Sequence, residues 1–241
     1  MRRRAATAGI LVAAAVASMG TSAEDAYIES DGTQGIVTDY YVTPKTRIVA
    51  DYAYTATTPR QMAVFGCDGA LVVRHYINGS GGYAFAFRND TGDWLPVTPT
   101  GQFPATTGRR TFDLDGPNRT ATLYTGGDVS AQRTTAAPTK TANRPLSIFS
   151  KTDNYYTLTY TADYYAKMRL YSLAIYEDGV LMRYYKPYRS ADGKFTGLKD
   201  LCTGKILIDF VSFAPFACGG DISDDTAWDL DGGCDFNSLK I

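Results

Sequence analysis

Short runs of strand-forming residues, separated by turn residues at intervals of about 8–15 residues, fill most of the sequence. Good helix formers such as Glu, Leu and Lys are sparse, whereas Thr, Tyr, Val, Gly and Asp are plentiful. We expect strands at Gly35–Asp39, Thr46–Ala56, Met62–Phe65, Ala70–Tyr76, Tyr83–Arg88, Thr111–Leu114, Thr120–Tyr124, Leu146–Phe149, Tyr155–Tyr160, Arg169–Tyr176, Val180–Tyr185 and Ile206–Phe213. This pattern predicts an all-β sandwich or barrel.

The clearest hairpin joins Tyr171–Tyr176 to Val180–Tyr185 through Asp178-Gly179. Asp-Gly supplies the positive φ angles that a tight hairpin turn requires. Tyr171, Leu173 and Ile175 alternate with smaller or polar neighbours, so period-two alternation places these three side chains on one face, the expected core face.

The first 23 residues are interpreted as a signal peptide. Three arginines open the chain, the run Ala5 to Ser18 is mostly apolar, and Thr21-Ser22-Ala23 suits a signal peptidase. The alternative is an uncleaved N-terminal anchor, although the run is short for the ~30 Å hydrocarbon layer. No other window is apolar enough to span a membrane. We therefore expect export, to the periplasm, the cell surface or the medium.

Composition divides the rest of the chain into residues 24–216, expected to form one β domain, and residues 217–241, an acidic tail that contains cysteine. The range Gly126–Asn143 is rich in Thr, Ala, Gly and Pro and is interpreted as a long surface connection. Removal of residues 1–23 takes away three of 24 basic residues and no acids, which leaves 21 basic against 25 acidic residues and a net charge of −4. There is no basic stripe, so nucleic-acid binding has no electrostatic support.

Four cysteines, Cys67, Cys202, Cys218 and Cys234, lie in a chain expected to enter an oxidising compartment. Four thiols allow three pairings, which sequence alone does not distinguish. The absence of a C-x-x-C spacing disfavours a zinc site. We predict a disulfide that fixes the C-terminal tail to the sheets, with the alternative that Cys67 is a small buried hydrophobe.

Several segments resemble the concanavalin A-like lectin/glucanase family of bacterial jelly-roll domains, of the laminin-G or pentraxin type. These are Tyr27–Asp39, Thr46–Asp51, Gly108–Leu114, Arg169–Arg183 and Asp192–Lys205. The resemblance implies a two-sheet antiparallel jelly roll used outside the cell for carbohydrate binding or adhesion. Two departures stand out, because Tyr184-Tyr185 replaces an Asp-Phe pair and residues 218–241 match nothing in the family.

Catalysis has little support in the sequence. Glycoside hydrolysis needs two carboxyl groups about 5–10 Å apart, and the glucanases of this fold place Glu-x-Asp-x-Glu on one strand. The chain has three glutamates, at Glu24, Glu29 and Glu177, and none forms that motif. Asp113 and Asp115 could share a strand face, but Asp115-Gly116-Pro117 reads as a strand end.

The single histidine, His75, lies on an expected strand. It would have to act alone as the base of a Ser-His-Asp triad, and no Gly-x-Ser-x-Gly elbow accompanies it. We interpret His75 as a structural or surface residue.

Calcium is the one cofactor that the sequence suggests. Asp225, Asp229 and Asp231, followed by Gly232, resemble half of a calcium loop, where alternating oxygens surround a hard cation. The competing interpretation is a solvated acidic tail that binds no metal.

Aromatic residues carry the ligand-binding prediction, because sugars pack their apolar faces against flat rings while their hydroxyl groups meet polar partners. In an adjacent pair on a strand, the two rings face opposite sides of the sheet, so one of each pair is free to bind. The alternative is that most of these rings pack inside the sheets. The candidates are Trp94, Tyr155, Tyr156, Tyr164, Tyr165, Tyr184 and Tyr185.

The sequence therefore predicts an exported, non-catalytic module that binds a glycan or a cell-surface partner. Two alternatives stay open: a structural or adhesion module that contacts protein, and a glycoside hydrolase that uses aspartates.

Overall fold

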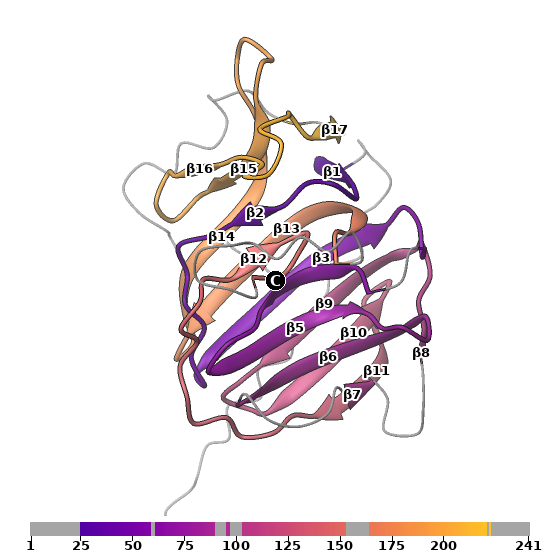
Figure 1. Cartoon of the computed structure of the whole chain (residues 1–241), viewed down its shortest axis with the longest axis vertical. Helices are drawn as coiled ribbons and strands as arrows, with labels where there is room; N and C mark the ends of the chain where they lie inside the picture. Colours follow the sequence, from indigo (N-terminus) through magenta and orange to yellow (C-terminus); the bar gives the residue numbers. More distant parts are fainter. Residues whose placement is uncertain are drawn as a thin grey trace, which may run out of the picture.

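The computed structural model describes residues 25–58, 61–89, 95–96, 103–152, 164–220 and 222. Their regular structure is all β-strand, and the strands form two antiparallel sheets that lie one in front of the other (Figure 1). The domain is an antiparallel two-sheet β-sandwich of the jelly-roll class, as the sequence predicts. Among these residues, no helix is long and apolar enough to cross a membrane.

The larger sheet, sheet A, has ten strands. Eight of them follow the order β11-β10-β9-β3-β13-β14-β15-β16, and β1 joins β13 to β17. Their bounds are β1 (Tyr27–Asp31), β3 (Thr46–Tyr54), β9 (Arg109–Asp115), β10 (Thr120–Thr125), β11 (Asp128–Thr134), β13 (Lys167–Glu177), β14 (Val180–Arg189), β15 (Thr196–Asp200), β16 (Ile206–Leu207) and β17 (Ala217–Gly219).

The smaller sheet, sheet B, has seven strands, six of them in the order β2-β12-β4-β5-β6-β7, with β8 also paired to β6. Their bounds are β2 (Ile36–Val37), β4 (Ala63–Cys67), β5 (Leu71–Ile77), β6 (Gly82–Asn89), β7 (Leu95–Pro96), β8 (Phe103–Pro104) and β12 (Ser147–Ile148). Figure 1 shows β5 and β6 in front of the strands of sheet A.

The core lies between the inner faces of the two sheets. Sheet A contributes fully buried side chains such as Ile48 and Phe112, and sheet B contributes Phe65, Val73 and Phe85. Because successive side chains of a strand point to opposite faces, the residues between these positions form the outer faces.

The β13–β14 hairpin confirms the predicted tight turn. Glu177 pairs with Val180, and the two residues between them have positive φ angles, 49° at Asp178 and 81° at Gly179. One detail of the predicted face is wrong. A bulge between Leu170 and Ser172 shifts the register, so Tyr171 lies on the outer face while Leu173 and Ile175 fill the core.

The predicted surface connection at 126–143 is corrected by β11. Gly126 and Gly127, both with positive φ, form a turn, and β11 then pairs with β10 along its whole length. The strand could not be predicted from the sequence because it lies at the edge of sheet A and buries one side chain, Ala131, so no alternation of apolar residues marks it.

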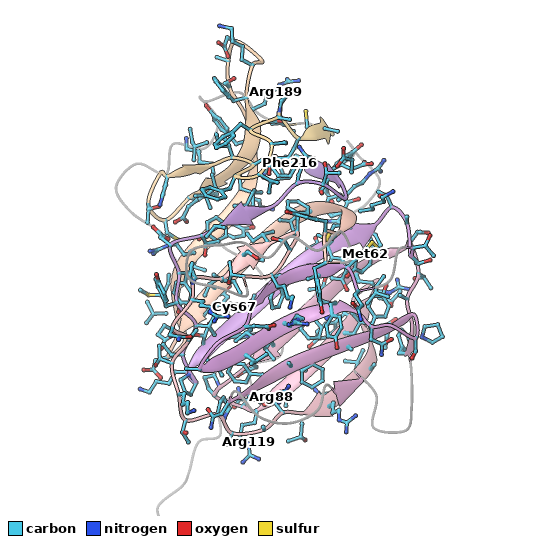
Figure 2. All side chains as sticks on the ribbon, in the orientation of Figure 1. Met62, Cys67, Arg88, Arg119, Arg189 and Phe216 are labelled. Atoms are coloured by element: carbon cyan, nitrogen blue, oxygen red, sulfur yellow. The ribbon has the colours of Figure 1, made fainter. Side chains whose placement is uncertain are left out.

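The last strands lie at the other edge of sheet A. The predicted strand at 206–213 is regular only over β16, whereas β17, which begins at the first residue of the expected tail, pairs with β1. Figure 1 shows β14 continuing past β13 and projecting with the β14–β15 loop from the rest of the sandwich. In Figure 2, Arg189 and Phe216 lie at this end of the molecule and Arg119 lies at the opposite end.

Candidate ligand-binding face

The outer face of sheet A carries a repeated arrangement of arginine, tyrosine and carboxylate side chains. Its basis is the alternation of β3, where Ile48, Ala50 and Tyr52 are buried and the intervening residues are half-buried on the outer side. Neighbouring strands in register add their own outward residues beside those of β3. Three groups result, each built on one arginine.

The first group is centred on Arg47. Its Nε and Nη2 atoms donate to Asp113 Oδ1 and Oδ2 at 2.9 and 2.7 Å, and its Nε lies 3.8 Å from Asp115 Oδ2. The guanidinium carbon lies 5.8 Å from the ring centre of Tyr176. The hydrogen bonds to Asp113 raise the pKa of Arg47, and burial raises the pKa of Tyr176. Arg47 is therefore charged and fixed in orientation.

The second group is centred on Arg109. It donates to both carboxylate oxygens of Asp51, at 2.9 and 2.6 Å, and to Asp25 Oδ2 at 2.5 Å. Its guanidinium carbon lies 3.9 Å from the ring centre of Tyr171, the residue that the bulge turns outward. This distance corresponds to a close cation–π contact.

The third group is centred on Arg169. Its Nε donates to Glu29 Oε2 at 2.8 Å, and its guanidinium carbon lies 4.3 Å from the ring centre of Tyr27. The rings of Tyr27 and Tyr171 meet edge to face at 5.9 Å. This contact joins the second and third groups into one surface.

We call this surface the arginine–tyrosine face. It comprises Tyr27, Glu29, Arg47, Asp51, Arg109, Asp113, Arg169, Tyr171 and Tyr176. The more exposed ion pairs, those of Arg109 and Arg169, contribute little to stability, so their main physical effect is to hold donors and acceptors in place. A face with fixed guanidinium and carboxylate groups beside the half-buried rings of Tyr27 and Tyr176 can bind a ligand that is both polyhydroxylated and partly apolar.

Of the tyrosines predicted as ligand-binding, Tyr184 lies beside this face. It is the cross-strand neighbour of Ala174, is half-buried, and has Lys186 Nζ 5.3 Å from its ring centre. Tyr185 points the other way, with a relative exposure of 1% in the core. The adjacent pair therefore occupies opposite sides of the sheet.

Tyr164 and Tyr165 belong to a different region. Lys151 Nζ lies 3.9 Å and the guanidinium carbon of Arg74 lies 5.1 Å from the ring centre of Tyr164, and both cations pair with Asp68 next to sheet B. Tyr165 is buried. The structure does not bring Tyr164 and Tyr184 into one site.

The remaining candidates, Trp94, Tyr155 and Tyr156, and the calcium candidates Asp225, Asp229 and Asp231, lie outside the described residues. In the part of the chain that the structure describes, no three His, Cys, Asp or Glu side chains are grouped closely enough to hold a metal ion. The calcium site stays a prediction.

His75 is a structural residue of the core, as the sequence analysis favoured. Its Nδ1 donates to the Ala84 carbonyl at 3.2 Å, so its Nε2 accepts from the Tyr52 hydroxyl at 2.6 Å. Its ring stacks on Phe112 with ring centres 3.7 Å apart and planes 4° from parallel. Burial lowers the pKa of His75 to about 3, so the ring is neutral.

The cysteines show no disulfide between any two of Cys67, Cys202 and Cys218. Cys67 is fully buried in the core, where burial raises the pKa of its thiol to about 12. Cys218 lies on β17 opposite Ile28, so strand pairing attaches this part of the tail to sheet A. Cys234 lies outside the described residues, and a bridge to it stays a prediction.

The acidic residues considered for catalysis are held by other side chains. Asp113 and Asp115 both lie on β9 and face Arg47. Glu177 accepts hydrogen bonds from Tyr40 and Thr46 at 2.8 Å each, and from Thr43. The sequence analysis did not identify a further pair of acidic residues. Glu29 and Asp31 alternate on β1 and line one pocket of about 250 Å³.

Sequence reasoning also missed the arginine–tyrosine face itself. The signal was the alternation of Thr46–Tyr54, in which Arg47 and Asp51 point to the outer face while Ile48, Ala50 and Tyr52 point to the core. Reading that alternation with the same pattern in β13 would place Arg169 on the same outer face. The pairing of β3 with both β9 and β13 comes only from the structure.

No family model matches the chain, and no curated protein matches its sequence. Membership of the bacterial family therefore stays a prediction. Among solved structures, a heptameric SAP-like pentraxin from Limulus polyphemus matches with a TM-score of 0.46 and 10% identity, over 66% of this chain and 78% of that chain. Mouse laminin α1 chain domains LG4-5 match with a TM-score of 0.44 and 12% identity, over 72% of this chain and 48% of that chain.

A scytalido-glutamic peptidase also matches, with a TM-score of 0.35 and 11% identity, over 78% of this chain and 98% of that chain. The pentraxin and laminin G neighbours are concanavalin A-like jelly-roll folds. At these scores and identities the matches carry no argument about a ligand or an activity of this chain.

Proposed function

We propose that the chain is an exported, non-catalytic recognition module that binds carbohydrate on the arginine–tyrosine face. The observation that supports this most is the threefold repetition of one unit, an arginine that lies over a tyrosine ring and is held by a carboxylate. Each unit offers charged hydrogen-bonding groups and ring surface side by side, the two kinds of contact that a sugar makes.

The fixed geometry of the units favours binding. Asp113 and Asp51 each hold their arginine with two hydrogen bonds, so the guanidinium planes are set before a ligand arrives. Preorganised groups lose less conformational entropy on binding than free side chains do. The tyrosines, with few rotatable bonds, share this advantage.

The carboxylates of this face support the non-catalytic part of the proposal. Asp113 and Asp115 share Arg47, and Glu29 pairs with Arg169. Each of these carboxylates is already paired with an arginine, which it holds in position on the face. Binding without bond cleavage is the simpler use of such groups.

The experiment is a screen on a glycan array and on insoluble polysaccharides of plant, animal and bacterial origin, followed by isothermal titration with any glycan retained. We expect Tyr176→Ala to weaken that binding about tenfold, because a ring of this size at the centre of a site contributes on the order of 1–2 kcal/mol. Arg47→Ala should weaken it similarly.

Tyr41→Ala is the matched control, since Tyr41 is an exposed tyrosine in the loop before β3 and lies outside the face. If the protein binds no glycan from any source, carbohydrate binding is rejected. If Tyr176→Ala and Tyr41→Ala weaken glycan binding equally, the protein binds glycan but not on this face.

One observation favours glycoside hydrolysis as a second candidate. Glu29 and Asp31 are two residues apart on β1, which separates their Cα atoms by roughly 6.5 Å, and they line the same pocket. Hydrolysis requires two carboxyl groups about 5–10 Å apart, and alternate positions on one face of a strand can bring two carboxyl groups into that range. Release of reducing sugar that disappears in both Glu29→Gln and Asp31→Asn would support this candidate, and release that persists in both would reject it.

A further inference from the structure

A strip of apolar side chains is exposed at the β16 edge of sheet A. It comprises Ile206, Ile208, Phe210 and Phe213, with relative exposures of 43, 39, 57 and 70%. The first three alternate along an extended segment, and the rings of Phe210 and Phe213 lie 6.3 Å apart. Single exposed apolar residues need no explanation, but a run of four large ones marks an interaction site.

The segment that carries the strip is firmly held, so its exposure does not come from a loose loop. Leu207 packs in the core, and the fully buried Asp209 accepts from the backbone amides of Gly35, Val211 and Ser212 at 3.0, 3.1 and 2.9 Å. The amide of Phe210 donates to the Gly35 carbonyl at 2.9 Å. Leu207 and Asp209 are therefore held on the inner side of the segment, and the side chains of the strip are held on the solvent side.

Two lysines adjoin the strip on the same face of the sheet. Lys199 is the cross-strand partner of Ile206, and Lys186 is the cross-strand partner of Lys199. Among the described residues neither lysine has an acidic partner within 4 Å. Like charges directly opposite each other destabilise a sheet, so this pair favours an anion next to it.

We propose that this strip docks on an anionic lipid surface, with the four apolar side chains in the interfacial layer and Lys186 and Lys199 at the lipid phosphates. Exposed apolar side chains next to lysines match the two interactions that bind a peripheral protein to a membrane. The strip is also narrow. A stable protein interface uses roughly 20–30 residues a side, whereas four side chains along one edge suit insertion between lipid headgroups.

The test is co-sedimentation of the purified protein with vesicles of phosphatidylglycerol and phosphatidylcholine, compared with vesicles of phosphatidylcholine alone. We expect binding to the anionic vesicles that falls as salt rises. The double variant Phe210→Ser/Phe213→Ser should lower the partition coefficient at least tenfold. The double variant Lys186→Gln/Lys199→Gln should lower it about fivefold per lysine, on the anionic vesicles only.

Two matched controls lie elsewhere on the molecule. Val129 is 59% exposed on β11 at the opposite edge of sheet A, and Lys45 is exposed in the loop before β3. Val129→Ser and Lys45→Gln should each change the partition coefficient less than twofold. A Phe213→Trp variant gives a direct reading of insertion, as a blue shift of the added emission when anionic vesicles are present.

All of the substituted side chains are exposed or half-buried, so the variants should fold, and circular dichroism checks that they do. The proposal is overturned if the protein does not bind anionic vesicles or if the control variants lose as much binding as the strip variants. It is also overturned if Lys186→Gln/Lys199→Gln leaves the partition coefficient on anionic vesicles unchanged. Light scattering adds one more contrary outcome, a dimer abolished by Phe210→Ser/Phe213→Ser, which would assign the strip to a second copy of the chain.

Discussion

The polar side chains on the two faces of sheet A come from the same strands but differ in their exposure and in their partners. On the inner face, Tyr52 is fully buried, and its hydroxyl is hydrogen-bonded to His75 of sheet B in the core. Most polar groups on the outer face are half-exposed, and they are paired around Arg47, Arg109 and Arg169. The difference indicates that inner polar residues serve stability, whereas outer ones are available to a ligand.

A second contrast lies within the outer face. Charges at its centre are matched by charges of opposite sign, whereas Lys186 and Lys199 near the β16 edge face each other without an acidic partner among the described residues. The matched centre suits a ligand recognised by hydrogen bonds, and the unmatched edge suits an anionic one.

The largest predicted effect concerns the inner face. Replacing His75→Ala should lower the free energy of unfolding by about 4 kcal/mol, because it opens a cavity beside Phe112 and leaves the Tyr52 hydroxyl without its partner. Urea unfolding followed by circular dichroism measures this change. A loss below about 1 kcal/mol would contradict the role of His75 as a core residue.

The next effect is a pH dependence of stability with the same origin. The folded pKa of His75 is about 3, below the ordinary value of 6.5, so the unfolded chain takes up a proton as the pH falls below 6.5 and the folded chain does not. The contribution of His75 is thus complete above pH 6.5 and is lost towards pH 3. Between pH 6.5 and 4.5 the loss should be about 2 kcal/mol.

The part of this window above about pH 5 lies above the ordinary range of carboxyl titration, and His75→Phe provides the control. We expect the free energy of unfolding of that variant to change little with pH between pH 6.5 and about 5. An equal slope in both proteins would assign the pH dependence to other groups.

The smallest effects compare the two parts of the outer face. Asp113→Ala removes the bidentate partner of Arg47 and should cost about 1–2 kcal/mol of stability. Lys186→Gln relieves a like-charge contact with Lys199 and should change stability by less than about 0.5 kcal/mol, in the stabilising direction. Thermal unfolding of the two variants side by side distinguishes them, and equal losses would remove the contrast.

Much of the fold follows from local sequence signals. The turn at Asp178-Gly179 and the buried alternation of β3 need only the chemistry of adjacent residues, and both agree with the structure. β11 could not be predicted in the same way, because an edge strand exposes most of its side chains and its Thr- and Ala-rich sequence resembles a loop.

The segment 206–210 shows where such reasoning fails. Alternation alone would bury Ile206, Ile208 and Phe210 and expose Leu207 and Asp209, whereas the structure does the reverse. The hydrogen bonds from Gly35, Val211 and Ser212 to Asp209 reverse the orientation, and one of these residues is 174 positions away in the chain. Long-range contacts of this kind leave no local pattern.

The sequence indicates tyrosine as a residue type for the candidate site, but it does not indicate where the arginine–tyrosine face lies. Tyrosines were expected to bind the ligand, and Tyr184 does lie beside the arginine–tyrosine face, yet Tyr171 reaches that face only through a bulge that a sequence does not reveal. The arginines were overlooked because each acts together with a carboxylate from another strand.

The most direct test of the account is radical footprinting of tyrosines, read by mass spectrometry, with and without a polysaccharide that the protein binds. We expect protection of Tyr176 in the arginine–tyrosine face and of Tyr184 beside it. We also expect protection of Tyr124, which is half-buried on β10 and pairs with Thr111 of β9 next to Asp113, and an unchanged rate at the exposed Tyr41. Protection of Tyr41 with unchanged rates at the other three would contradict it.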